Sequence, residues 1–161
     1  LPSGFYMSEI NDSKKLSEKK REQLYPIIME KAISVGIGVV DSETIDRVNI
    51  LNATKMAMKM AINNLSVKPE HVLIDAVKLD IDIPYTAIIK GDAKSESIAA
   101  ASIVAKVYRD NMMKELDKEY PMYDFKSNKG YGTKKHIEAI KKYGVLKEHR
   151  KTFKPVSDYV K

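Results

Sequence analysis

The chain has 161 residues, of which 43% are apolar and 31% charged, and its formal net charge is +6. This length suits one domain with a sizeable core, and the composition is that of an ordinary globular protein. There is no cysteine, no apolar run that could cross a membrane and no leader resembling a signal peptide. These features exclude a disulfide framework, a thiolate metal site and a membrane partner, and we expect a cytoplasmic protein.

Apolar periodicity predicts alternating helices and strands. Ser17 is the expected N-cap of the first helix, and Pro26 is expected to kink or divide it. Strands are predicted at residues 34–43, 71–77 and 85–92, and helices at 16–33, 49–65, 95–119 and 133–143. Alternation of this kind is typical of an α/β layered fold.

The helix at 95–119 carries apolar residues at spacings of three and four. This spacing is typical of a helix. The apolar positions that show it are Ile98, Ala101, Ala105, Tyr108, Met112 and Leu116.

Two aspartates close the second and third predicted strands. Asp75 follows the apolar run Val72 to Ile74, and Asp92 ends the stretch "YTAIIKGD". If the carboxyl ends of these strands meet at one edge of a sheet, the two carboxylates lie close together and favour a divalent cation between them. Two such ions about 3.5–4 Å apart support phosphodiester hydrolysis. Alternatively, Asp92 caps the following helix and Asp75 is a turn residue.

Basic residues gather around the second aspartate and in the last part of the chain. Lys90 and Lys94 flank Asp92, and Lys14 and Lys15 precede the first helix. Residues 126–161 hold eleven Lys and Arg against three acids, a charge of +8, which leaves −2 for residues 1–125. A basic segment of this kind indicates contact with a nucleic-acid backbone, and a solvated lysine surface is the alternative.

Four blocks of this sequence carry a resemblance to a known family. They are "NDSKKLSEKKREQLY" (11–25), "NILNATKMAM" (49–58), "VLIDAV" through "KGDAKSESIAAASIVAKVYRD" (72–110) and "YPMYDFKSNKGYGTKKHIEAIKKYGVLKEHRKTFKPV" (120–156). In this order they resemble the type 2 ribonucleases H, bacterial ribonuclease HII in particular. The resemblance implies a ribonuclease H-like α/β fold with a mixed sheet flanked by helices.

The resemblance also implies an activity. Such a hydrolase is an endonuclease that cuts the RNA strand of RNA–DNA hybrids and nicks DNA 5′ to an embedded ribonucleotide, leaving a 3′-hydroxyl and a 5′-phosphate. It uses Mn²⁺ or Mg²⁺ and serves ribonucleotide excision repair and DNA replication. The family enzyme is implied to be a monomer.

The matched positions assign roles to residues of this chain. Asp75 and Asp92 match two of the family's four acidic catalytic and metal-binding residues, and the family's glycine after the first of them is Ala76 here. Tyr131 in "KGYGT" matches the tyrosine that stacks near the ribose, a contact that distinguishes RNA from DNA. From the residues alone, the favoured interpretation is that Tyr131 is a loop aromatic between two turn glycines. Further nucleic-acid contacts are expected from Lys14, Lys15, Lys90, Lys94, Lys129 and Lys134.

His136 and His149 lack metal-ligand spacing and are expected to be structural or peripheral. Residues 1–125 are predicted to form a truncated ribonuclease H-like core, and residues 126–161 a basic, helical, substrate-binding segment of the same domain.

The family's Asp-Glu pair, followed by Gly-Arg-Gly on its first strand, has no counterpart in this sequence. Leu1 and Pro2 match the point just after the family's second strand, so the first two strands are expected to be missing. The strands at 34–40 and 72–75 would then lack the neighbour between them. We therefore expect these 161 residues alone to show little or no nuclease activity and to self-associate. The alternative function is that of a non-catalytic nucleic-acid-binding remnant.

Overall fold

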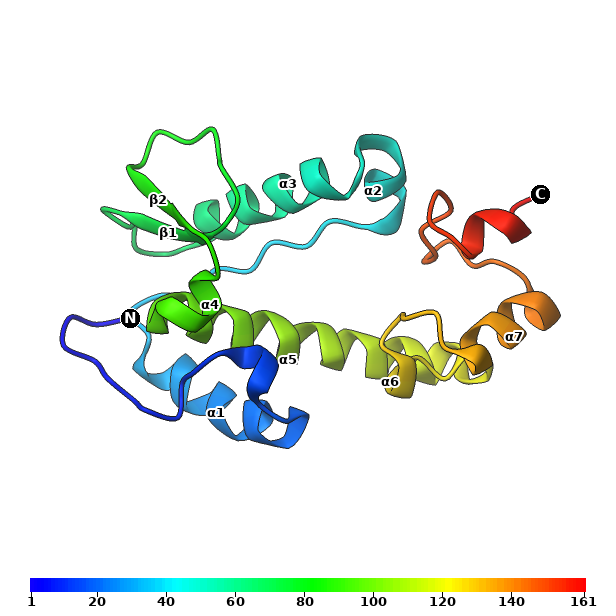
Figure 1. Ribbon diagram of the computed structural model, residues 1–161, viewed down its shortest axis with the longest axis horizontal. Helices are drawn as coiled ribbons and strands as arrows, with labels where there is room; N and C mark the ends of the chain where they lie inside the picture. Colours follow the sequence, from blue (N-terminus) through cyan, green and yellow to red (C-terminus); the bar gives the residue numbers. More distant parts are fainter. The chain divides into compact units, whose positions relative to one another are not determined.

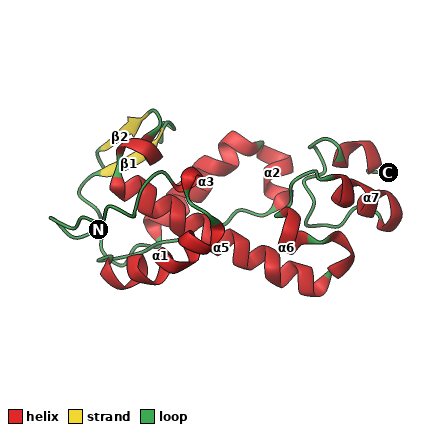
Figure 2. Ribbon diagram, turned by 60° about the horizontal axis from the view of Figure 1, so that its bottom comes forward, coloured by secondary structure: helices red, strands yellow, loops and turns green.

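The computed structural model describes residues 1–161, which form two compact units. The first unit comprises residues 1–39 and 57–108, and the second comprises residues 40–56 and 109–161. Figure 2 shows a helix-rich chain with one small sheet. No helix is both long and apolar enough to cross a bilayer. The elements, labelled in Figure 1, are α1 (Glu18–Lys31), α2 (Ser42–Val48), α3 (Ile50–Asn63), β1 (Val72–Asp75), β2 (Tyr85–Ile88), α4 (Gly91–Lys94), α5 (Glu96–Glu119), α6 (Phe125–Asn128) and α7 (Lys134–Tyr143), with 3₁₀ turns at Ser13–Lys15, Pro121–Tyr123 and Val156–Tyr159.

The sheet consists of β1 and β2, which pair in parallel with Asp75 opposite Ile88. The strands predicted at 71–77 and 85–92 are therefore confirmed, with shorter bounds. Their parallel pairing brings both carboxyl ends to the same edge of the sheet. This edge is where the two candidate aspartates are found.

The strand predicted at residues 34–43 does not form. Its first part runs without a ladder partner along α3, where Asn64 Nδ2 donates to the carbonyl of Ile37 at 2.7 Å. An ideal Cβ on Gly36 or Gly38 would collide with the backbone carbonyls of Ala61 or Ala57. Glycine permits this close approach of backbone to helix, so the segment packs on α3 in place of a neighbouring strand.

Helix α1 begins as predicted, because Ser17 Oγ accepts the N–H of Lys20 at 3.1 Å. Pro26 lies inside the helix and does not divide it. The core of the first unit joins Leu24 and Ile28 of α1 to small and branched residues of α5, which are Ala99, Ala100, Ile103, Val104 and Val107.

The helix predicted at residues 95–119 is confirmed as α5, but the apolar positions that indicated it do not form one buried face. Ala101, Ala105, Tyr108 and Met112 are exposed, and only Ile98 of the expected set is fully buried. Helix α5 carries apolar residues on more than one face, so the elements that pack against it decide which face is buried.

The second unit is built around aromatic rings. Tyr123 and Phe125 stack 5.4 Å apart and pack with Ala139, Ile140 and Val156. Helix α2, which the sequence had not predicted, is capped by Asp41, whose carboxylate accepts the N–H of Thr44 at 2.8 Å.

Candidate active site

Asp75 connects the end of β1 to the turn that follows β2. Its Oδ1 accepts the backbone N–H of Gly91 at 3.0 Å, which ties the end of β1 to the start of α4. An ideal Cβ on Gly91 would lie 2.6 Å from Cδ1 of Ile98 and 3.3 Å from Cα of Asp75. A side chain at position 91 would therefore push the second aspartate away from the first. The interpretation of Asp75 as only a turn residue does not account for this hydrogen bond, which connects β1 to α4.

Two residues of this edge hold a left-handed backbone. Ala76 has φ of 59° and Lys90 has φ of 55°, a region that costs residues with a Cβ about 1 kcal/mol. Lys90 occupies the N-cap position of α4 without a side-chain capping bond. The turn at Lys90 directs the chain from β2 straight into the four-residue helix that carries Asp92.

Asp92 is only 4% exposed, and its carboxylate does not cap a helix. Oδ1 accepts the backbone N–H of Ser13 at 3.3 Å, and Oδ2 accepts the Ser13 hydroxyl at 2.5 Å. Lys106 Nζ in turn donates to Oγ of Ser13 at 2.6 Å. The three residues, of which Ser13 and Asp92 are buried and Lys106 is partly buried, form a network that connects α4, the turn at Ser13–Lys15 and α5.

Charges of both signs surround Lys106 in this network. Burial lowers the pKa of Lys106 from its usual value of 10.5; the charge of Asp92 opposes this shift most strongly, Arg21 and Lys14 add to it, and Asp12 opposes it weakly. The ammonium group of Lys106 therefore lies between carboxylates and other cations.

The predicted lysine contacts of the first unit all reach solvent. Lys14 and Lys15 are exposed in the turn that holds Ser13, and Lys90 and Lys94 are exposed at the two ends of α4. These lysines therefore surround the segments that carry Asp92 and Ser13. Their ammonium groups are free of the core and can meet a polyanion.

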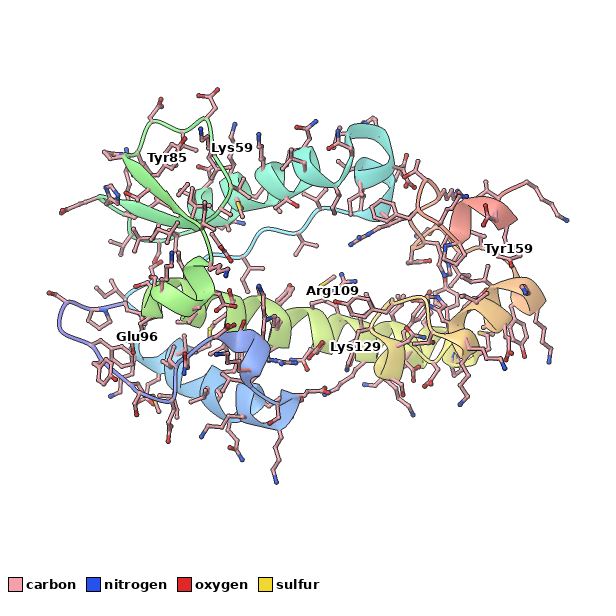
Figure 3. The ribbon with its side chains drawn as sticks, in the orientation of Figure 1. Lys59, Tyr85, Glu96, Arg109, Lys129 and Tyr159 are labelled. Carbon is pink, nitrogen blue, oxygen red and sulfur yellow. The ribbon has the colours of Figure 1, made fainter.

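The remaining predicted contacts lie in the second unit. The side chain of Tyr131 is 76% exposed, whereas its backbone is held: its N–H donates to the carbonyl of Asn128 at 2.8 Å. Arg109 donates to the carbonyl of Lys129 at 3.3 Å, and Figure 3 labels this pair. Lys134 is exposed at the first position of α7. The loop after α6 thus presents a free aromatic ring on an anchored backbone.

The carboxylate oxygens at the sheet edge are of the type that binds divalent cations, but there are too few of them for a complete site. Asp75 and Asp92 offer the carboxylate oxygens that Mg²⁺ and Mn²⁺ prefer. No cluster of three or more His, Cys, Asp or Glu side chains suited to a metal exists among the 161 residues. Since Mg²⁺ is commonly held by one or two carboxylates together with substrate phosphate, these two residues suit part of such a site.

Ser13 and Lys106 were missed at the level of the sequence. Ser13 lies 79 positions from Asp92, and Lys106 lies 93 positions from Ser13. A weak signal existed in "SIVAKV", where one lysine interrupts a run of small apolar residues. A cation at such a place indicates a buried partner of opposite charge or a polar network.

Comparison with known proteins identifies relatives along almost the whole chain. The family model described as Ribonuclease HII matches residues 5–156. The chain is 62% identical over its full 161 residues to a ribonuclease HII of Bacillus cytotoxicus and 60% identical to one of Bacillus anthracis, and it spans 62% and 63% of their lengths. The crystal structure of the ribonuclease H2 from Pyrococcus horikoshii OT3 matches with a TM-score of 0.75 and 27% identity, covering 92% of this chain and 79% of that one.

Proposed function

The chain belongs to the ribonuclease HII family, and we propose that the protein is a metal-dependent endonuclease that hydrolyses the RNA strand of RNA–DNA hybrids. It also nicks DNA 5′ to embedded ribonucleotides and leaves a 3′-hydroxyl and a 5′-phosphate. The product of the complete reading frame uses Mn²⁺ or Mg²⁺, is located in the cytoplasm and acts as a monomer in ribonucleotide excision repair and replication. The single observation that carries this proposal is the pairing of Asp75 with the Gly91–Asp92 turn at one sheet edge, inside the matched residues.

Each proposed contact has a task that its position supports. Asp75 and Asp92 would hold the divalent ion, which would supply positive charge where the phosphodiester is attacked and where the leaving oxygen departs. Ser13 and Lys106 orient the carboxylate of Asp92, because the Ser13 hydroxyl donates to it and Lys106 donates to that hydroxyl. The exposed Lys14, Lys15, Lys90 and Lys94 bind phosphates beside the site.

Recognition of the sugar is assigned to the second unit. The exposed ring of Tyr131 stacks near the ribose, and contact with a 2′-hydroxyl is the feature that separates RNA from DNA. Lys129 and Lys134 contribute salt-sensitive affinity for the nucleic-acid backbone.

These 161 residues by themselves hold two suitable acids, which is too few to cage two divalent ions. We therefore expect little or no cleavage from this polypeptide alone, and we expect it to self-associate through unpaired backbone groups at residues 34–40 and at β1. Turnover by the 161-residue polypeptide in Mn²⁺ would contradict the first expectation, and a monomer in sedimentation would contradict the second.

The activity is tested with three end-labelled duplexes: DNA with one ribonucleotide, an RNA–DNA hybrid and all-DNA. The polypeptide translated from the complete reading frame that encodes these residues is incubated with each in Mn²⁺ and in Mg²⁺. We expect nicks in the first two duplexes, 5′ to the ribonucleotide, with 3′-hydroxyl ends that a polymerase extends. Equal cutting of all-DNA, or 3′-phosphate ends, would refute the proposal.

The alternative is a nucleic-acid-binding protein without catalysis. The incomplete acid set and the +8 charge of residues 126–161 favour it for the polypeptide as it stands. Binding of hybrid that persists in a chelator, with no cleavage by the complete reading-frame product, would establish this alternative.

A further inference from the structure

Two histidines lie in contact in the interior of the second unit. His136 on α7 is 3% exposed and His149 is 6% exposed, and their Nε2 atoms are 3.1 Å apart. The rings of Tyr123 and Phe125 lie 5.4–6.4 Å from those of the histidines. Each ring nitrogen of a buried histidine is expected to have a hydrogen-bond partner, because an unpaired polar group inside a protein lowers its stability.

The partners of the pair determine where each proton sits. The backbone N–H of Leu146 points at Nδ1 of His149 at 2.9 Å, and since an amide N–H only donates, this Nδ1 carries no hydrogen. At the other end, Nδ1 of His136 lies 2.8 Å from the carbonyl oxygen of Tyr131, and since a carbonyl only accepts, this Nδ1 carries a hydrogen. One hydrogen remains for the Nε2 pair, and a neutral His149 supplies it to His136.

The result is a chain of three bonds with one direction. Leu146 N–H donates to His149, His149 Nε2–H donates to His136, and His136 Nδ1–H donates to Tyr131. Protonation of either ring reverses a donor: at His136 two N–H groups would face each other, and at His149 the new N–H would face that of Leu146. The arrangement therefore requires both imidazoles to be neutral.

The surroundings favour the neutral pair. Burial and the neighbouring His136 lower the pKa of His149 from 6.5 to about 4. The titratable group that faces the pair is Tyr123, whose own pKa burial raises, so that it is neutral in the same range. Glu148 and Arg150 flank His149 in the sequence.

The chain of bonds ends on the backbone of the residue whose ring is exposed. The carbonyl of Tyr131 accepts from His136 and also from the N–H of Thr133 at 2.9 Å. The N–H of His136 in turn donates to Oγ1 of Thr133 at 3.2 Å. One histidine thus fixes both the carbonyl of Tyr131 and the cap of α7.

We propose that His136 and His149 are positioning residues for ribonucleotide recognition, a relay of fixed hydrogen-bond direction that holds the backbone of Tyr131 where its ring meets the sugar. This role rests on the proposed function of Tyr131. A site that reads a ribose needs its contacting ring held by rigid support, and the relay supplies that support from a buried aromatic core. Neither histidine touches the substrate.

The first test reads the protons directly. Long-range ¹⁵N–¹H spectra of the histidine rings at pH 7, in the complete reading-frame product, report which nitrogen of each imidazole is protonated. The relay predicts a hydrogen on Nδ1 of His136 and on Nε2 of His149. The opposite tautomer at either residue, or a charged ring, would overturn the relay without any assay of activity.

The second test compares binding of a duplex with one ribonucleotide and of all-DNA, in chelator, as the ratio of the two Kd values. His136→Leu removes the donor to Tyr131 and is expected to lower the ratio roughly fivefold, the equivalent of one hydrogen bond. His136→Asn keeps an N–H near the place of Nδ1 and is expected to restore most of the ratio. His71→Leu, at an exposed histidine of the first unit, is the matched control and is expected to change nothing.

The outcomes separate the two proposals. An unchanged ratio in His136→Leu, or no rescue by His136→Asn, would overturn the positioning role while the proposed function stands. A wild-type protein that binds both duplexes equally would overturn the proposed function and the role in recognition with it, even where the tautomers are as predicted.

Discussion

The hydroxyl of Ser13 donates to Oδ2 of Asp92 across a sequence separation of 79 residues, and both side chains are buried. Lys106 donates to the same hydroxyl oxygen, so one serine links a buried carboxylate to a partly buried ammonium group. Removal of that oxygen leaves two charged groups without their shared partner.

Ser13→Ala is therefore expected to destabilise the protein by about 1–3 kcal/mol, the cost of leaving buried polar groups unpaired. Urea unfolding followed by circular dichroism measures this change. Ser8→Ala, at an exposed serine, is the control and is expected to stay within about 0.5 kcal/mol of the wild type. Equal stability of the two variants would show that the network is not important to the fold.

Ala76→Gly is expected to stabilise the protein by about 0.5–1 kcal/mol, because Ala76 holds a left-handed backbone that glycine adopts without a clash. Thermal unfolding measures the gain. Ala101→Gly is the matched control: Ala101 is exposed inside α5, and there the same change is expected to cost about 1 kcal/mol. Destabilisation by both changes would show that the turn after β1 is not left-handed.

Stability is expected to fall as pH decreases from about 6.5 to about 4, and His149 is the cause. Its pKa in the folded protein is about 4, so the unfolded chain takes up a proton in this window while the folded protein does not. His149 lowers the free energy of unfolding by at most about 3 kcal/mol across this window. Urea midpoints at intervals of half a pH unit measure it, and His149→Asn is expected to flatten the slope. A slope that persists in the variant would assign the effect to other groups.

Lys134→Gln is expected to weaken binding to hybrid and to all-DNA by the same factor and to reduce the salt slope of log K by about 0.9, the value for one phosphate contact. Fluorescence anisotropy at salt concentrations of roughly 50 to 200 mM measures both the affinity and its salt slope. Lys31→Gln, at the exposed end of α1, is the control. A slope unchanged by Lys134→Gln would place this lysine outside the nucleic-acid interface.

The sequence predicted best those features that depend on a local residue pattern. Apolar runs before Asp75 and Asp92 predicted two strands, and β1 and β2 pair in parallel with their carboxyl ends at one edge of the sheet. Asp75 ends β1 as expected, whereas Asp92 lies beyond β2, in α4. The family resemblance and the ribonuclease H-like α/β fold are confirmed by the family model and by the likeness to the archaeal structure. The assignment of individual site residues and the division of the domain at residue 125 stay predictions.

What the sequence missed depends on long-range contacts. The roles of Ser13 and Lys106 arise from partners 79 and 93 positions away, which no local pattern reveals. The strand expected at 34–43 fails because a strand needs a pairing partner, and the glycines there permit packing on α3 instead. The buried face of α5 is likewise decided by packing partners distant in sequence, among them Leu24 and Ile28 of α1.

The most direct test of the central claim is the nicking of a duplex with one ribonucleotide in Mn²⁺ by the complete reading-frame product and by its Asp75→Asn and Asp92→Asn variants. Circular dichroism confirms that each variant is folded before its rate is compared. Both substitutions are expected to lower kcat by at least about a hundredfold, because each would remove a proposed carboxylate ligand of the ion. Variants that nick at the wild-type rate would contradict the assignment of this sheet edge as the active site.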